Sequence, residues 1–109
     1  MRQPAAVEHP GRMKIVNYAT YTPLREKAAA LRPAHREYMT RLHADGQLVA
    51  YGPFADGGGA LLIYETGSLA IAQEILAADP YQVGGVFAGC RLGVWDVVKA
   101  NPALMRATP

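Results

Sequence analysis

The residues best suited to chemistry in this chain are a histidine and an aspartate that lie far apart in the sequence. His35 belongs to the stretch LRPAHREYM, residues 31–39, and in a helix it shares one face with Leu31 and Tyr38. An imidazole on the inward face of a helix serves either as a structural hydrogen-bonding group or as a general acid/base. Asp79 precedes a proline at the end of a second expected helix, so its backbone is restricted and its carboxylate can reach sideways.

A contact between these two side chains would form an acid/base pair. In the order of elements expected below, both helices pack on the same face of one sheet, so the two side chains can approach each other. A carboxylate bonded to one imidazole nitrogen fixes the tautomer and leaves the other nitrogen to take or give a proton near neutral pH. We therefore predict that His35 and Asp79 are catalytic residues, with a purely structural His35 as the alternative.

A second candidate region is the glycine-rich stretch YGPFADGGG, residues 51–59. Gly52 permits the close approach of backbone or ligand, and Pro53 makes the chain rigid where a strand ends. A hairpin with a flexible tip explains the same composition without any function. The three consecutive glycines lack the spacing and the following lysine of a phosphate-binding loop, so nucleotide binding is not indicated.

Metal and thiol chemistry receive little support from the sequence. His35 and His43 lie two helical turns apart, too far for both to bind one ion, and no His/Cys cluster has zinc spacing. Cys90 has Arg91 beside it, which favours a thiolate, but a small buried thiol near a strand is the more ordinary interpretation. We therefore expect no metal and no cofactor.

The composition limits the classes of partner. Half of the 109 residues are hydrophobic, 18% are charged and the net charge is +2, which is typical of one globular domain. The basic residues form no run that could follow a phosphate backbone, so we expect no nucleic-acid partner. No apolar run is long enough for a membrane helix, and the first residues lack the apolar core of a secretory signal. A single cysteine excludes an internal disulfide and agrees with a reducing, cytoplasmic location.

The chemistry depends on elements that bring the two side chains together. We expect a flexible extension at 1–12, one domain at 13–98 and a tail at 99–109. Periodicity and turn residues predict strands at 13–21, 47–54, 60–65 and 91–98, helices at 24–32, 33–44 and 67–80, and a loop or short strand at 81–90. The order βαββαβ predicts an α+β ferredoxin-like fold, a four-stranded antiparallel sheet with two helices on one face.

Two helix boundaries have specific signals. Pro33 cannot donate a backbone hydrogen bond, so we expect a break at Arg32 and a main helix that starts at Pro33. Ser68 is a good N-cap for the helix of the second half.

One face of this sheet would lack a cover. In ALLIYE, residues 60–65, and in VWDVV, residues 94–98, apolar side chains point to both faces of the sheet. Two helices cover only one face of a four-stranded sheet, so the other face needs a partner. We expect a second copy of the chain, packed sheet to sheet about a two-fold axis, in a homodimer or higher homo-oligomer. Trp95 would lie in the core or at this interface.

These segments, in this order, resemble the YCII-related (YciI-like) family. The resemblance is carried by LRPAHREYM, DGQLVAYGPF, GGGALLIYET, ADPY and GVWDVV, and it extends from Lys14 to Val98. It implies a ferredoxin-like fold of the dimeric α+β barrel superfamily that dimerises through its sheet.

The same resemblance implies a site. It places the active site at the histidine and the aspartate singled out above, with substrate-binding residues at Arg32, Gly52, Pro53 and Tyr81. Tyr81 stands where relatives usually have phenylalanine, which adds a hydroxyl group to the pocket. Some related proteins eliminate from or isomerise chlorinated hydroxyquinones and similar ring compounds by proton transfer, without a cofactor.

Three functions remain open at this point. The first is a cofactor-independent lyase or isomerase for a small cyclic or aromatic molecule, with His35 as the base and Asp79 orienting it. The second is a non-catalytic module that binds a small ligand or a protein partner, which would retain a ligand without converting it. The third is a cofactor-free oxygenase, which would take up oxygen with an electron-rich quinol.

Overall fold

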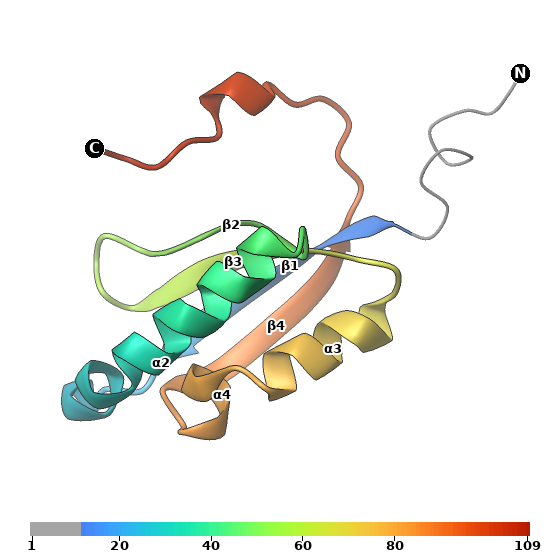
Figure 1. Ribbon diagram of the computed structural model, residues 1–109. Helices are drawn as coiled ribbons and strands as arrows, with labels where there is room; N and C mark the ends of the chain where they lie inside the picture. The colour runs from blue at the N-terminus through green and yellow to red at the C-terminus, as the bar shows by residue number, and fades with distance from the viewer. Residues whose placement is uncertain (1–11) are drawn as a thin grey trace, which may run out of the picture.

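The computed structural model describes residues 12–109, and its four strands form a single antiparallel sheet (Figure 1). The strands are β1 (Met13–Tyr21), β2 (Leu48–Pro53), β3 (Gly59–Thr66) and β4 (Phe87–Trp95), in the spatial order β2-β3-β1-β4. The helices are α2 (Arg25–Ala44), α3 (Leu69–Ala77) and α4 (Pro80–Val83), followed by a 3₁₀ turn η1 (Pro102–Leu104). The predicted α+β ferredoxin-like fold is confirmed. The predicted N-terminal extension, residues 1–12, lies almost wholly outside the described residues.

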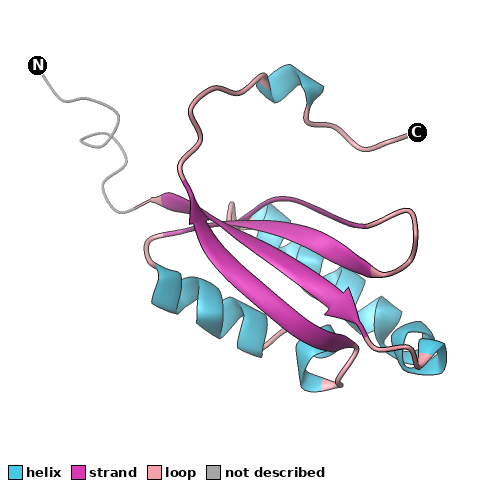
Figure 2. Cartoon of the chain, turned by 180° about the vertical axis from the view of Figure 1, so that it is seen from behind, coloured by secondary structure: helices cyan, strands magenta, loops and turns pink. Residues whose placement is uncertain are grey.

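The helices lie together on one face of the sheet, as the views from its two sides show (Figures 1 and 2). Alternate residues of the central strands point toward them, and Ile15 of β1 and Leu62 and Tyr64 of β3 are fully buried. Met39 of α2 and Val86, which precedes β4, are fully buried in the same core. Helix α2 also packs against α4. The core therefore holds α2 next to the junction of α3 and α4.

Helix α2 runs unbroken through Pro33, and the predicted break at Arg32 is wrong. Pro33 removes one intrahelical hydrogen bond, the one to the carbonyl group of Ala29. Ala29 is exposed, so water can solvate this carbonyl. On either side of the proline, Leu31 and Leu42 pack against the same core. The packing of one continuous apolar face outweighs the single lost bond, because tertiary contacts supply most of the stability of a helix.

The second half of the chain departs from the predicted boundaries. The predicted helix 67–80 is shortened to α3, and its predicted cap is present, because the Ser68 hydroxyl accepts a hydrogen bond from the N–H three residues on at 3.2 Å. The segment 81–90, predicted as a loop or short strand, instead holds most of α4 and the first half of β4. Strand β4 starts as early as Phe87 because it pairs with β1 up to Tyr21, across a β-bulge.

No helix of residues 12–109 lies on the other face of the sheet (Figure 2), although apolar side chains of the strands point to it; of these, Ile63 is already buried by its neighbours. On this face Val16 and Tyr18 of β1 lie opposite Ile63 and Leu61 of β3, and Tyr18 is 54% exposed. Trp95 of β4 lies on the same face and is 44% exposed, so it is not a core residue of this chain. We call these five side chains the open face.

The chain after β4 leaves the sheet and runs outside the body of the domain (Figure 1). All residues from 98 to 109 are exposed, including the apolar side chains of Val98, Leu104 and Met105. The core is therefore complete without this segment. No helix within residues 12–109 is both long and apolar enough to span a bilayer.

Candidate active site

The side chains of His35 and Asp79 meet where α2 passes the junction of α3 and α4. Nδ1 of His35 lies 2.8 Å from Oδ1 of Asp79, and the two residues are only 6% and 0% exposed. An ionised carboxylate can only accept hydrogen bonds, so His35 donates through its Nδ1–H and keeps Nε2 as a proton acceptor. The structure thus brings together the two residues that the sequence singled out.

The position of Asp79 follows from its place as the N-cap of α4. Its Oδ1 accepts a hydrogen bond from the N–H of Tyr81 at 2.9 Å, and Pro80 occupies the first turn, where a proline fits a helix. Oδ1 therefore serves the helix cap and the imidazole at once. The other oxygen, Oδ2, is buried and receives no hydrogen bond from residues 12–109. His35 is consequently the main partner of the Asp79 charge.

The His35 ring is held among aromatic side chains. Tyr81 stacks on it with ring centroids 3.9 Å apart and planes 5° from parallel. Tyr51 of β2 and Phe87 of β4 meet the imidazole edge-on, with centroids 5.8 and 6.2 Å away. The Tyr81 hydroxyl donates a hydrogen bond to the carbonyl of Ala28 at 3.3 Å, which ties this ring to α2. Packing therefore fixes the orientation of the imidazole together with the Asp79 carboxylate.

A cavity of about 800 Å³ opens beside this pair, between the first half of α2, the end of β1 and the β2–β3 turn. Its size falls in the range of small-molecule sites. Of the predicted substrate-binding residues, Arg32, Pro53 and Tyr81 line the cavity together with His35, whereas Gly52 does not. Successive residues of a strand face opposite sides of the sheet, so Gly52 belongs to the face opposite that of Pro53.

The cavity also contains residues that the sequence analysis missed. Tyr21 and Tyr51 line it from β1 and β2, and Arg25 and Arg36 line it from α2. The two arginines lie seven positions before and four positions after Arg32, so helical periodicity alone could have placed all three on one face. The tyrosines gave no comparable signal, because the strand register decides which alternate residues point toward the helices.

Burial has the largest effect on the pKa of Tyr21 and of Cys90. It raises the pKa of Tyr21, with further raising effects from Tyr81 and Asp79 and an opposing effect from the positive charge of Arg32. Tyr21 is therefore a neutral phenol at neutral pH and can donate a hydrogen bond. Burial also raises the pKa of the Cys90 thiol, so this residue is a protonated, half-buried thiol rather than a nucleophile.

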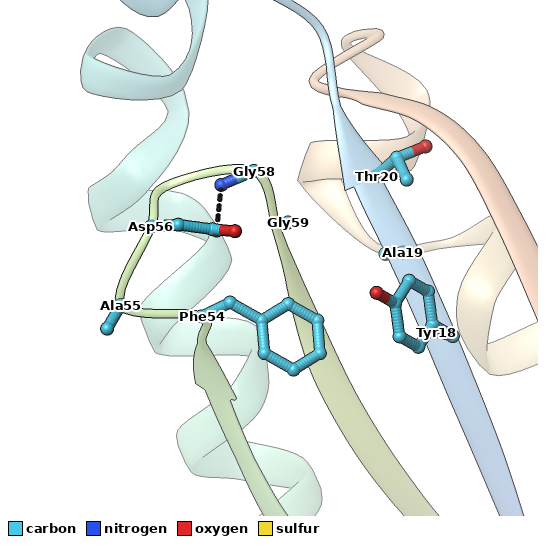
Figure 3. A pocket seen from close by; sticks show the side chains of 8 residues that line it. All are labelled: Tyr18, Ala19, Thr20, Phe54, Ala55, Asp56, Gly58 and Gly59. Atoms are coloured by element: carbon cyan, nitrogen blue, oxygen red, sulfur yellow. Dashed lines mark hydrogen bonds between the residues drawn. The ribbon is translucent and has the colours of Figure 1, made fainter.

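A second, smaller pocket of about 310 Å³ lies at the β2–β3 turn (Figure 3). Tyr18 and Phe54 border it, with ring centroids 5.2 Å apart. Asp56 closes the turn, because its Oδ1 accepts a hydrogen bond from the N–H of Gly58 at 2.8 Å. The described lining of this pocket has no histidine, lysine or cysteine. We therefore place the candidate active site in the larger cavity.

Nowhere in residues 12–109 do three His, Cys, Asp or Glu side chains gather as a metal site would require.

The family model of the YCII-related domain matches residues 13–96 of this chain. Protein YjpA of Bacillus subtilis (strain 168) is 41% identical over 47% of this chain and 60% of its own length. Protein YciI of Escherichia coli O6:H1 is 38% identical over 57% of this chain and 74% of its own length. The chain thus spans about three-fifths of YjpA and three-quarters of YciI.

Two solved structures share the fold. TftG of Burkholderia phenoliruptrix AC1100, a 5-chloro-2-hydroxyhydroquinone dehydrochlorinase in complex with 2,5-dihydroxybenzoquinone, superposes with a TM-score of 0.69. It is 23% identical, and the match covers 77% of this chain and 94% of TftG. Rv0793 of Mycobacterium tuberculosis gives a TM-score of 0.54 at 20% identity, covering 82% of this chain and 97% of the other. At these identities the likeness is one of fold.

Proposed function

The chain belongs to the family of YCII-related domains, and from that premise we propose that it is an acid/base enzyme in which His35 is the base and Asp79 orients it. The proposed reaction is a lyase- or isomerase-type proton transfer on a small cyclic or aromatic compound bound in the cavity. One observation carries the proposal: the 2.8 Å contact between Nδ1 of His35 and Oδ1 of Asp79, in a buried pair whose histidine lines the cavity.

The geometry suits His35 to take a proton through Nε2. Its Nδ1–H is engaged with Asp79, so in the neutral ring Nε2 carries the lone pair. When Nε2 takes a proton from a C–H or O–H group of the substrate, the electron pair left behind forms a new double bond. In an elimination a leaving group departs with its own electron pair, and in an isomerisation the proton returns at another carbon. The Asp79 carboxylate stabilises the imidazolium that forms in between.

A hydroxylated quinone or hydroquinone is the first substrate class to test. TftG, which has the same fold, is a dehydrochlorinase of 5-chloro-2-hydroxyhydroquinone. In this chain the rings of Tyr21 and Tyr51 line the cavity and offer flat surfaces to such a molecule. The Tyr21 phenol, whose pKa burial raises, supplies a hydrogen-bond donor for a substrate oxygen.

Chloride release from 5-chloro-2-hydroxyhydroquinone by the full chain tests the proposal. We expect turnover by the wild type and a loss of about 10²–10⁴-fold in His35→Gln, the range that a general base contributes. His43→Gln is the matched control, because His43 is an exposed histidine in the last turn of the same helix, and its turnover should equal that of the wild type.

Two results would favour the other functions. If the wild type binds the compound and returns it unchanged, the cavity belongs to a non-catalytic binding module. If turnover consumes oxygen in proportion to the compound, the chain is a cofactor-free oxygenase. Equal turnover in His35→Gln and wild type would contradict the role given to His35.

A further inference from the structure

Three arginines of α2 line the wall of the cavity on the same side as His35. They are Arg25, Arg32 and Arg36, at spacings of seven and four residues, which place them on one face of the helix. No aspartate or glutamate is found among the described residues that line the cavity. Before any substrate binds, the cavity wall therefore carries three positive charges and no negative one.

These three guanidinium groups also lack ion-pair partners within residues 12–109. Some other basic side chains of the described chain do have partners: Lys14 lies 2.9 Å from Glu65, and Arg41 lies 3.5 Å from Glu37 on the outer side of α2. The Asp79 carboxylate, which lies behind the imidazole, is engaged with His35. The lining arginines thus keep their charge available for a bound molecule.

The three charges are spread along the cavity. A Cβ atom placed on Gly57 would lie 3.7 and 3.8 Å from the two terminal nitrogens of Arg25, so this guanidinium lies against the β2–β3 turn. Arg25 is ten residues from His35, about 15 Å along a helix axis. Arg32 lies three residues from His35 in the same helix, and its positive charge acts to lower the pKa of the Tyr21 hydroxyl. Arg36 follows His35 directly in the sequence and lines the same cavity.

From this arrangement we propose that the cavity selects a planar ring compound that is an anion at neutral pH, with its negative group held by Arg32 and Arg36 beside His35. This inference extends the proposed function, and its chemical interpretation depends on that function. A guanidinium binds a carboxylate or an enolate oxygen pair through two parallel hydrogen bonds. Abstraction of a proton by His35 adds negative charge to the substrate, and the same arginines stabilise that charge as it forms. Arg25 attracts the anion at the outer end.

Calorimetric titration with matched pairs of probes tests the inference without any turnover. One pair is 2,5-dihydroxybenzoquinone, which ionises readily, and its neutral dimethyl ether. The other pair is benzoate and benzamide, which have the same shape and differ in charge. We expect at least one anion to bind about tenfold more tightly than its neutral partner and to lose that advantage in high salt. A preference within the quinone pair indicates an enolate-type group, and a preference within the benzoate pair indicates a carboxylate.

Arginine variants locate the charge that the anion uses. Arg32→Gln and Arg36→Gln should each weaken binding of the anion by about tenfold and leave the neutral partner unaffected, with a smaller effect from Arg25→Gln. Arg41→Gln is the matched control, because Arg41 lies on the same helix but outside the cavity, and it should bind as the wild type does. Equal binding of anion and neutral partner in both pairs, or an equal loss in Arg41→Gln, overturns the inference.

The same titration separates this inference from the acid/base proposal. Anion-selective binding by a wild type that shows no turnover upholds the charge selection and contradicts the enzyme. Turnover with no preference between charged and neutral compounds contradicts the charge selection alone.

Discussion

Oδ1 of Asp79 lies 2.8 Å from Nδ1 of His35 and 2.9 Å from the backbone nitrogen of Tyr81. One oxygen atom therefore both orients the proposed base and starts helix α4. The ring of Tyr81, positioned by that helix, stacks on the imidazole. The fold around α4 and the geometry of the proposed base therefore depend on the same side chain. A substitution that keeps the shape of this side chain and removes its charge can test the two roles separately.

Asp79→Asn removes the charge of this residue and retains an oxygen that can cap α4. We expect the variant to fold, because the amide oxygen can still accept the hydrogen bond from the N–H of Tyr81. We expect turnover to fall by about 10²-fold or more, because the imidazolium loses its counter-charge. Nitrogen NMR of the His35 ring should show protonation at Nδ1 in both proteins, because the oxygen that caps α4 can still accept from Nδ1–H.

Asp56→Asn is the control for this substitution. Asp56 also accepts a backbone hydrogen bond with Oδ1, from Gly58, but it is exposed and does not contact His35. The His35 tautomer and the turnover of this control should equal those of the wild type. Wild-type turnover in Asp79→Asn would show that the charge of Asp79 does not assist the proposed base.

The stacked ring of Tyr81 gives a second prediction, because its hydroxyl and its ring can be removed separately. Tyr81→Phe keeps the ring and loses the 3.3 Å hydrogen bond to Ala28, so we expect a loss of stability of about 1 kcal/mol or less and turnover within about threefold of the wild type. Tyr81→Leu removes the stacking itself. We expect it to lower turnover by about tenfold and stability by about 1–3 kcal/mol, measured by urea unfolding. Equal turnover in the two variants would contradict a role for the stacked ring.

The central features of this site were predictable because they follow from local rules. Helical periodicity placed His35 on the buried face of its helix, and the proline after Asp79 fixed the backbone of the aspartate at a helix end. The βαββαβ order then required both helices to share a face of the sheet.

The missed features depend on contacts between distant residues. Helix α4 has four residues, too few for periodicity to show, and it forms because the Asp79 side chain caps it. The continuity of α2 through Pro33 depends on core contacts before and after the proline, which outweigh the local preference for a break. The entry of Tyr21 into the cavity depends on which alternate residues of β1 face the helices, and the packing of the sheet against the helices decides this.

Buried tyrosines give a prediction for alkaline pH. Burial raises the pKa of Tyr64, and the hydrogen bond that its hydroxyl accepts from Asn17 opposes this effect only in part. A group whose pKa is higher in the folded than in the unfolded chain contributes its full stability below the unfolded value of about 10, and that contribution is lost as the pH rises above it. Burial raises the pKa of Tyr21 and Tyr38 as well, so their contributions have the same sign.

The free energy of unfolding should therefore fall as the pH rises beyond about 10. Tyr64→Phe should reduce this fall, since the buried group that resists ionisation is gone. At pH 7 the same variant should be less stable than the wild type by about 1–3 kcal/mol, because Asn17 loses its buried acceptor. Urea unfolding at neutral and alkaline pH measures both effects, and an unchanged pH dependence in Tyr64→Phe would contradict the assignment to Tyr64.

The open face gives the last prediction, and we propose that a second copy of this chain covers it. The helices of the described chain lie on the opposite face, while Tyr18 and Trp95 remain 54% and 44% exposed on this one. An apolar sheet face of this kind costs solubility unless a partner covers it, and packing about a two-fold axis covers both copies at once. Sedimentation of the wild type should give twice the 11.7 kDa mass of one chain.

Tyr18→Arg and Trp95→Arg should each shift this equilibrium toward the monomer, because in a symmetric interface each substitution buries two new positive charges, one from each copy. Ile71→Arg is the matched control: Ile71 is an apolar residue, 39% exposed, on α3 at the other face of the sheet, and this variant should remain a dimer.

Trp95 is the only tryptophan of the chain, so its fluorescence reports on this face alone. Dilution of the wild type should move its emission to longer wavelength as the indole meets water. If the wild type sediments as a monomer at micromolar concentration with no such change, the open face is solvated and the proposed dimer does not form.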